Sequence, residues 1–323
     1  MRVLVVGAIQ GGTAPLCGPL QKAFADAGQE SDCLDFSPHS EEFLRLQFSG
    51  DEERTYRFHL DIRLELLEKI RRFEPELVFG IAQSPLHDPE ILGALRKAGI
   101  KLAFWFVEDY RAFDYWKRIC HLFDRFFAIQ KEPFSRLGNF HYLPPACDPD
   151  SCDLPAAERD IAVSFVGAPY PNRVNFFARL NCAGFRIFGE GWSACGNPCV
   201  EVGNRRLSAR EARSVYARSR INLNLHSETD PVGFGGDFVN PRTFELAGMG
   251  AFQLTNMRKH LPLHFDPADE VIALSRWEDM KAAVEYFLKH PQEAEEIAAR
   301  AKARAMRDHT LRQRAEEVLN FFM

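Results

Sequence analysis

Residues 77–107 read LVFGIAQSPLHDPEILGALRKAGIKLAFWFV and carry the clearest strand–helix–strand signal of the chain. The apolar run at 77–81 is typical of a buried strand. Asp88 and Pro89 are a helix cap and a first-turn proline, so they predict a helix that extends to residue 98. A second apolar run at 101–107 predicts the next strand. Strands that alternate with helices in this way form a mostly parallel sheet with helices on both faces.

The same alternation continues on both sides of this stretch. Apolar runs predict strands at residues 2–6 and 125–129, and helical patterns predict helices at 14–27, 54–73 and 113–122. In the long helix, five apolar residues are predicted to lie on one face: Phe58, Ile62, Leu66, Leu67 and Ile70. The first half of the chain is therefore expected to form a doubly wound, Rossmann-like α/β domain.

A second series of the same kind begins near residue 161. Its apolar runs predict strands at 161–166, 185–188, 221–225 and 251–255, with a helix at 172–183. Two Ser-x-x-Glu capping boxes predict further helix starts, Ser208 with Glu211 and Ser275 with Glu278. After residue 275 the pattern is almost entirely helical. The second half is thus expected to be another Rossmann-like domain, followed by C-terminal helices.

Residues 144–160 break the alternation, beginning with Pro144-Pro145. We therefore predict an N-terminal domain at 1–146, a linker at 147–160, a C-terminal domain at 161–308 and a terminal helix at 309–323. Ligands of doubly wound sheets bind beyond the carboxyl ends of the strands, so a cleft between two facing domains is the expected site.

The composition excludes several classes of protein. The 323 residues carry a formal net charge of −5, which disfavours a general nucleic-acid binder. The apolar run at the N-terminus is too short for a signal peptide, and no stretch is long enough to span a bilayer, so a cytoplasmic location is expected. The close cysteine pairs lack a second pair or a histidine at zinc-site spacing, namely Cys147 with Cys152 and Cys195 with Cys199. No metal site is expected.

The segment at 233–250, GFGGDFVNPRTFELAGMG, runs from a glycine-rich loop into a capped helix. The free N–H groups and the dipole at a helix start suit an anion such as a diphosphate. Arg242 adds a permanent positive charge there, and Glu245 could accept two hydrogen bonds from the hydroxyls of a ribose. The alternative is structural: Asn240 and Pro241 only start a helix, and Glu245 pairs with Arg242.

This segment resembles the nucleotide-binding stretch of GT-B glycosyltransferases of the group 1 type. The shared pattern is two acidic residues separated by seven, Asp237 and Glu245, followed by a helix rich in alanine and glycine. The resemblance implies that the domain at 1–146 is the acceptor side, that the domain at 161–308 binds the donor, and that the helix at 309–323 packs back towards the first domain. It also implies that Glu245 holds the donor ribose. Asp237 stands where the family usually has glutamate. The helix start between them, Asn240, Pro241 and Thr243, is assigned to the same donor site.

The resemblance extends towards the N-terminus of this domain. Residues 164–173, SFVGAPYPNR, are similar to the opening strand and turn of the donor domain in the CgeB-like, spore-maturation branch. This similarity implies that Gly167 and Arg173 approach the donor phosphates. Gly189 falls on the second turn of the donor domain, and His226 ends the strand before the acidic pair. The structural alternatives are a plain turn for Gly167, a solvated Arg173 and a buried, satisfied His226.

Two further candidates lie in the first half. The loop Gly7-x-x-x-Gly11-Gly12-Thr13 fits neither the dinucleotide fingerprint nor a Walker A loop. In a GT-B enzyme it would line the cleft near the phosphates or the acceptor; otherwise it is a tight turn. Glu108 and Asp109 follow the strand at 101–107. One of them could deprotonate an acceptor hydroxyl in an inverting enzyme, and the alternative is an exposed helix cap.

The resemblance and these residues predict a hexosyltransferase-like glycosyltransferase. Its donor would be a nucleotide-diphosphate sugar, expected to be a UDP-sugar, and Arg173 and Arg242 would replace a metal or other cofactor at the leaving group. The sequence does not identify the acceptor, which could be a glycan, a protein or a small molecule, nor the oligomeric state. Two alternatives stay open: a nucleotide-sugar epimerase on the same fold, and a non-catalytic nucleotide-sugar-binding protein of cell-surface or spore-layer assembly.

Overall fold

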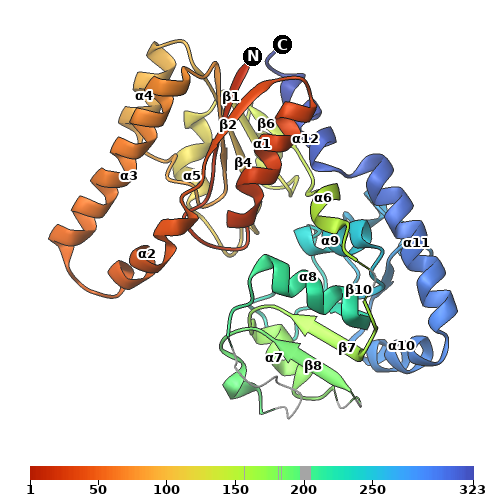
Figure 1. Cartoon of the computed structure of the whole chain (residues 1–323). Helices are drawn as coiled ribbons and strands as arrows, with labels where there is room; N and C mark the ends of the chain where they lie inside the picture. The colour runs from red at the N-terminus through yellow and green to blue at the C-terminus, as the bar shows by residue number, and fades with distance from the viewer. Residues whose placement is uncertain (156, 181, 183, 197–204) are drawn as a thin grey trace. The chain divides into compact units, whose positions relative to one another are not determined.

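The computed structural model describes residues 1–155, 157–180, 182, 184–196 and 205–323. Within them the chain divides into two compact units (Figure 1). Unit 1 consists of residues 1–144 together with 311–323, and unit 2 consists of residues 145–310. Along the part of the chain that is described, no helix has the length and apolar character needed to cross a membrane.

Unit 1 is built on a six-stranded parallel sheet with the order β2-β1-β3-β4-β5-β6. The four strands predicted from apolar runs are confirmed, β1 (Arg2–Val6), β3 (Leu77–Ile81), β4 (Lys101–Phe106) and β5 (Arg125–Ala128). The two edge strands, β2 (Glu30–Leu34) and β6 (Phe140–Tyr142), were not predicted. Both are largely half-buried, so they lack the continuous apolar run of a central strand.

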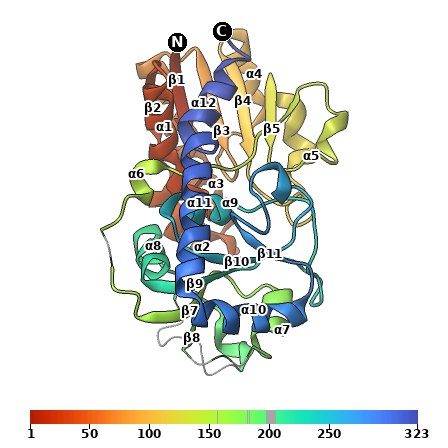
Figure 2. The ribbon, with the colours of Figure 1, turned by 90° about the vertical axis from the view of Figure 1, so that its right-hand side faces the viewer.

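The helices of unit 1 differ from the predictions mainly in length. The regions at 14–27 and 113–122 each combine a short 3₁₀ turn with an α-helix, the second of only one turn. The α-helices are α1 (Cys17–Asp26), α2 (Ser40–Gln47), α3 (Glu52–Phe73), α4 (Pro89–Lys97), α5 (Trp116–Ile119) and α12 (Leu311–Leu319). The terminal helix α12 packs against α1, as Figure 2 shows.

One residue of the predicted buried face of α3 is exposed. Phe58, Ile62, Leu66 and Ile70 are buried, but Leu67 is 40% exposed. Its prediction was wrong because one residue turns a helix by about 100°, which takes position 67 away from the face that position 66 occupies.

Unit 2 contains a five-stranded parallel sheet with the order β11-β10-β9-β7-β8. Its strands are β7 (Ile161–Val166), β8 (Phe185–Phe188), β9 (Ser219–Asn224), β10 (Gln253–Asn256) and β11 (Ile272–Leu274). Its α-helices are α6 (Pro149–Cys152), α7 (Pro171–Phe177), α8 (Ala209–Arg218), α9 (Pro241–Met249), α10 (Trp277–Lys289) and α11 (Pro291–Asp308). The two parallel sheets confirm the predicted doubly wound α/β fold.

The helix starts of unit 2 test the capping predictions directly. The box at Ser208 and Glu211 is present and opens α8. The predicted box at Ser275 and Glu278 was wrong: α10 begins after Arg276, and no side chain caps it. Helix α7 ends at Phe177, so it is shorter than predicted, and Ala183 and Cys199 lie outside the described residues.

Candidate functional site

Two glycine turns meet at the carboxyl edge of the unit 2 sheet. Gly167 follows β7 and Gly189 follows β8, and both have positive φ angles, +152° and +146°. A side chain at Gly189 would place its Cβ 2.3 Å from the carbonyl oxygen of Gly167, which also accepts a 2.7 Å hydrogen bond from the Trp192 indole. Only glycine allows the two backbones to approach so closely.

Arg242, in the first turn of α9, lies against this pair of turns. Its Nε donates to the hydroxyl of Tyr216 at 3.0 Å, and its guanidinium lies 5.5 Å from the ring centroid of Phe165. Its Nη2 is 3.2 Å from the position that a Cβ of Gly167 would occupy. Its Nη1 is buried and has no hydrogen-bond partner. Leaving a buried donor unpaired costs free energy. An anion that accepted a hydrogen bond from this nitrogen would remove that cost.

Glu245 lies one turn further along α9 and faces α8. Its nearest cation is the Nη1 of Arg213, 3.8 Å from Oε1, and a third of the Glu245 side chain is exposed. Burial raises the pKa of Glu245, and the charges of Arg242 and Arg213 oppose this shift. The Nε of Arg213 is a second buried donor without a partner at this edge. Glu245 therefore pairs with Arg213 and keeps an accessible carboxylate.

Arg173 in α7 is neither solvated nor free. It is 6% exposed, and its Nε and Nη2 both donate to the carbonyl of Leu225, at 3.0 and 2.6 Å, while Nη1 donates to Ala168 at 3.2 Å. Burial, together with the charge of Arg242, lowers the pKa of Arg173 to about 9. The guanidinium thus stays charged near neutral pH, and it ties the turn after β7 to the end of β9.

The start of α9 offers fewer donors than the sequence suggested. The side-chain oxygen of Asn240 accepts from both the backbone N–H and the hydroxyl of Thr243, each at 3.0 Å. Pro241 has no N–H to donate. The cap therefore consumes part of the anion-binding capacity of the helix terminus, and the guanidinium groups beside it are the main donors of this edge.

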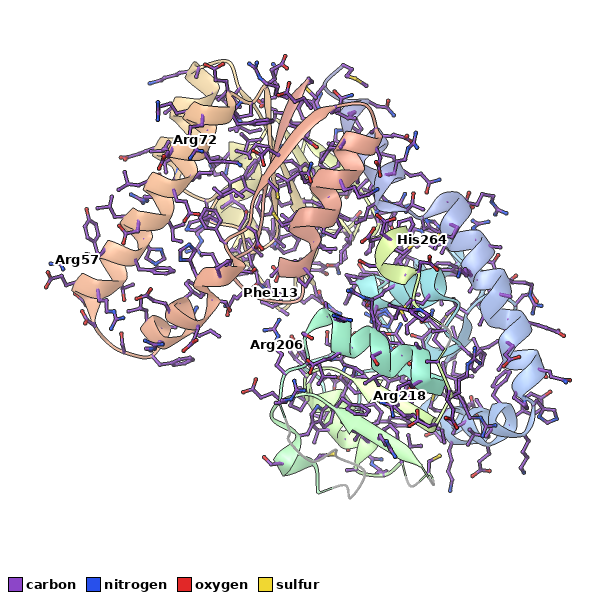
Figure 3. The ribbon with its side chains drawn as sticks, in the orientation of Figure 1. Arg57, Arg72, Phe113, Arg206, Arg218 and His264 are labelled. Carbon is purple, nitrogen blue, oxygen red and sulfur yellow. The ribbon has the colours of Figure 1, made fainter. Side chains whose placement is uncertain are left out.

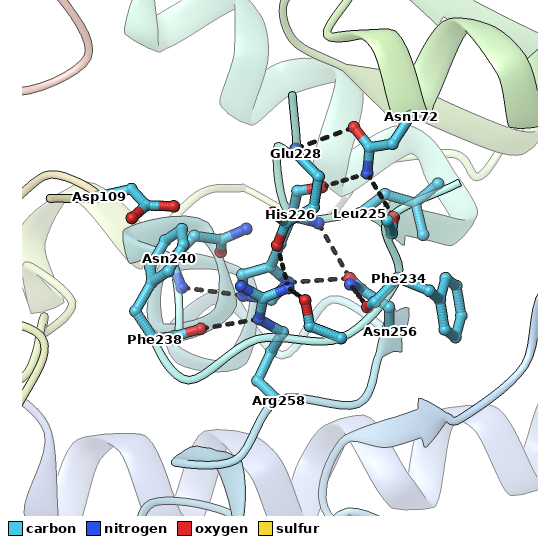
Figure 4. A network of polar contacts seen from close by, with 12 residues as sticks. Asp109, Asn172, Leu225, His226, Glu228, Phe234, Phe238, Asn240, Asn256 and Arg258 are labelled. Carbon is cyan, nitrogen blue, oxygen red and sulfur yellow. Dashed lines mark hydrogen bonds and ion pairs between the residues drawn. The ribbon is translucent and has the colours of Figure 1, made fainter. Parts of the chain in front are cut away.

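His226 contacts Asn240, where the glycine-rich loop meets helix α9 (Figure 4). It is fully buried, its Nδ1 lies 2.9 Å from Oδ1 of Asn256, and its Nε2 accepts from the backbone N–H of Asn240 at 3.0 Å. These contacts fix a neutral ring with the proton on Nδ1. Burial and the charge of Arg258 lower the pKa of His226 well below its usual range. Both ring nitrogens have hydrogen-bond partners within the protein, so the ring would influence a bound ligand only by positioning Asn240.

A buried ion pair between Arg258 and Glu228 also contacts this loop. Arg258 is fully buried, and its Nη1 contacts Glu228 at 2.8 Å and the carbonyl of Gly235 at 2.8 Å, while its Nε donates to Phe238 at 3.0 Å. Asp237 lies in this loop and is partly exposed. Glu228 and Arg258 were not predicted from the sequence, because a pair thirty positions apart leaves no local pattern.

The carboxyl edge of the unit 1 sheet carries the loop after β1. Gly11 has a φ of +95°, and a Cβ there would lie 2.5 Å from Oε1 of Gln83. The hydroxyl of Thr13 donates to the carbonyl of Ala82 at 3.0 Å. Gly12 faces open space, because a Cβ added there would have nothing within 4 Å. The loop therefore rests on the residues that follow β3 and exposes Gly12.

Glu108 and Asp109 follow β4 at the same edge, and both are buried with several donors. Glu108 accepts from the amide of Gln83 and from the hydroxyl of Tyr115. Burial raises its pKa, against both hydrogen bonds. Asp109 is held by the guanidinium of Arg111, with Nη2 at 2.7 Å. Neither is the exposed helix cap of the alternative prediction.

The side chains that commonly bind metal ions are those of histidine, cysteine, aspartate and glutamate. Among the residues described, no group of three or more histidine, cysteine, aspartate or glutamate side chains could hold a metal ion. The expected cleft between two facing domains stays a prediction.

A family model and a known protein match this chain in sequence. Residues 173–320 match the family model described as glycosyl transferase-like. Spore protein CgeB of Bacillus subtilis (strain 168) is 24% identical over 257 residues, which are 73% of this chain and 79% of that protein.

Two solved structures share the fold along the whole chain. Anabaena HepE in complex with UDP-glucose has a TM-score of 0.63 at 11% identity, with 99% of both chains covered. UDP-GlcNAc 2-epimerase from Neisseria meningitidis, bound to UDP-GlcNAc, has a TM-score of 0.58 at 11% identity, again with 99% of both chains covered. These findings confirm the GT-B fold and the CgeB-like resemblance. The epimerase among them shows that the fold alone does not establish sugar transfer.

Proposed function

We propose that this chain, whose residues 173–320 match the glycosyl transferase-like family, transfers a sugar from a nucleotide-diphosphate sugar that binds at the carboxyl edge of the unit 2 sheet. Uridine diphosphate is the proposed leaving group, and no metal ion is needed to stabilise it. The acceptor is a hydroxyl-bearing molecule of a class that the site does not define.

The observation that carries this proposal is the guanidinium of Arg242, whose buried Nη1 has no hydrogen-bond partner and whose Nη2 lies beside the bare backbone of Gly167. A diphosphate placed there would receive charge-assisted hydrogen bonds from Arg242, which are stronger than neutral ones. Arg213 adds a second unpartnered donor, and Arg173 adds a positive charge whose three nitrogens already donate to backbone carbonyls. Glu245, with a third of its side chain exposed, is the proposed ligand of the donor ribose.

In the proposed reaction, the bond between the anomeric carbon of the sugar and the β-phosphate oxygen breaks, and a bond to the acceptor oxygen forms. The diphosphate leaves with the negative charge, which the arginines stabilise where it develops. The acceptor hydroxyl loses a proton. Glu108 and Asp109 are the proposed candidates to accept it in an inverting enzyme, and either would first release a hydrogen bond.

Isothermal titration with UDP, GDP, ADP and dTDP tests the donor site. We expect UDP to bind most tightly, and Arg242→Ala to weaken its binding about 10- to 100-fold, since a hydrogen bond to a charged group contributes about 1.5–3 kcal/mol. Glu245→Ala should weaken UDP binding to a smaller extent. Arg210→Ala is the matched control, because Arg210 is exposed on α8. Equal UDP affinity in wild type and Arg242→Ala would exclude Arg242 from the site.

The reaction class requires a separate measurement. Incubation with UDP-sugars and a panel of hydroxyl acceptors should give glycosylated product, and a chelator such as EDTA should leave the rate unchanged. An isomerised sugar nucleotide without acceptor would identify an epimerase instead. UDP binding with neither a glycosylated acceptor nor an isomerised sugar nucleotide as product would favour a non-catalytic binding protein.

A further inference from the structure

Helix α3 presents an apolar stripe on its outer face. Tyr56, Leu60, Leu64 and Leu67 are 67%, 40%, 54% and 40% exposed, and we call these four residues the outer stripe. Their spacing of four, four and three residues places them on one side of the helix. The buried face of α3, which includes Phe58 and Ile62, points in another direction. A contiguous exposed apolar patch of this kind indicates an interaction surface.

The charges of α3 indicate what covers the outer stripe. Glu52 and Glu53 lie in its first turn, and Arg71 and Arg72 lie in its last turn. Figure 3 shows Arg57 and Arg72 near opposite ends of the helix. The helix as a whole mixes acidic and basic side chains in nearly equal number, which does not suit an anionic lipid surface. A second α3 in antiparallel orientation would bring each acidic end against a basic end.

We propose that the outer stripe of α3 is a self-association surface, on which a second copy of this chain packs its own α3 in antiparallel orientation. Such a contact is isologous, so one two-fold axis relates both halves. With this axis opposite Ile62, Leu60 of one copy faces Leu64 of the other, because the two leucines lie two residues on either side of it. Glu53 and Arg71 lie nine residues on either side, so they also face each other.

The ion pairs within one copy are compatible with this register. Glu53 contacts Arg57, and Glu68 contacts Arg72 at 3.6 Å, both along the helix. In the portion of the chain that the structure describes, Arg71 has no ion partner. Its guanidinium is therefore available to Glu53 of the second copy. Antiparallel packing also places the helix dipoles in the favourable orientation.

Sedimentation equilibrium of the full chain over a wide concentration range tests the association. We expect a monomer–dimer equilibrium, and we expect Leu60→Glu and Leu64→Glu each to weaken it about 100-fold or more, because each substitution places two carboxylates in the apolar contact. Leu263→Glu is the matched control, since Leu263 is 51% exposed and lies in unit 2. A monomer at every concentration, or a dimer that Leu60→Glu leaves intact, would overturn the proposal.

A charge exchange tests the antiparallel register itself. Glu53→Arg and Arg71→Glu should each weaken the dimer about tenfold, and the two together should restore it to within about threefold of wild type, because like charges then become opposite again. Circular dichroism verifies that α3 still folds in each variant. Failure of the double variant to recover would refute this register. Binding of the monomer to anionic phosphatidylglycerol vesicles, lost in Leu60→Glu, would assign the stripe to a membrane surface instead. Neither experiment depends on the proposed sugar transfer.

Discussion

The carboxyl edges of the two sheets are both formed by the ends of parallel strands, but their functional side chains carry opposite charges. At the unit 2 edge, Arg242 and Arg213 each have a buried nitrogen without a hydrogen-bond partner. At the unit 1 edge, the carboxylates of Glu108 and Asp109 accept hydrogen bonds from several neighbours. One edge thus presents unsatisfied positive donors, whereas the other presents negative charge that is already satisfied.

This difference separates an edge with unpartnered positive donors from an edge whose two carboxylates already accept hydrogen bonds. The fold explains why functional groups gather at both edges, because parallel strands all end there. It does not explain which groups meet a ligand. The atoms without partners make that distinction, since leaving a buried donor unpaired costs free energy that a bound anion would recover.

The largest expected effect comes from the ion pair that supports the unit 2 edge. We expect Arg258→Met to lower the free energy of unfolding by about 3–5 kcal/mol, because it removes the buried cation that pairs with the carboxylate of Glu228. Urea denaturation followed by circular dichroism measures the change, and hydrogen exchange shows whether it is confined to unit 2.

Two further variants test the cause of this loss. Arg159→Met breaks an exposed ion pair with Glu295 and should change stability little. The combined change Glu228→Met and Arg258→Met should be less destabilising than Arg258→Met alone, because the buried carboxylate is then removed together with its cation. A double variant that is as unstable as the single one would show that the contacts of Arg258 with backbone carbonyls matter more than its charge pairing.

The next effect contrasts two glycines, Gly189, which is closely packed at the unit 2 edge, and Gly12, which has open space at the unit 1 edge. Gly189→Ala should destabilise unit 2 by about 2–3 kcal/mol, because its Cβ would meet the carbonyl of Gly167 and its φ of +146° is strained for alanine. Gly12→Ala at the unit 1 edge has open space and should be nearly neutral. Thermal unfolding of both variants measures the contrast, and similar losses would contradict it.

The sequence predicted most of this framework because central strands and capped helices have local signals. The buried strands β1, β3, β4 and β7 follow from apolar runs, and α8 follows from its capping box. The edge strands β2, β6 and β11 escaped because half-buried strands have mixed composition, whereas the edge strand β8 was predicted. The failed box at Ser275 shows that a motif of two residues does not guarantee a cap, since the helix began after Arg276 instead.

The candidate site was less predictable, because its roles depend on contacts between distant positions. The sequence drew attention to Arg173 and His226, but only the fold shows that Arg173 donates to backbone carbonyls and that Asn256 and the backbone of Asn240 occupy the ring nitrogens of His226. The buried state of His226 was foreseen as the alternative. No sequence pattern pairs Glu228 with Arg258, or Glu245 with Arg213, because tertiary packing alone brings these side chains together.

The two edges should also respond to pH in opposite directions. His226 has a lowered pKa in the folded protein, so below pH ~6.5 the unfolded chain binds a proton that the folded chain does not. Wild type should therefore lose stability on acidification, by up to ~1.4 kcal/mol per pH unit, and His226→Gln should lack this loss. Urea titrations of both proteins between pH 5 and 8 measure the difference. A difference that does not change with pH would mean that His226 becomes charged without cost.

Glu108 provides the smallest effect and the opposite sign. Burial raises its pKa in the folded protein, so the folded state holds the proton more tightly than the unfolded state. The resulting stabilisation is complete below pH ~4.3 and is lost as the pH rises through the pKa of the folded state. Relative to Glu108→Gln, wild type should thus become less stable as the pH rises above ~4.3. The same urea titrations measure it. If both variants shifted in the same direction, the two edges would share one electrostatic character, and the contrast between donor-rich and carboxylate-rich edges would fail.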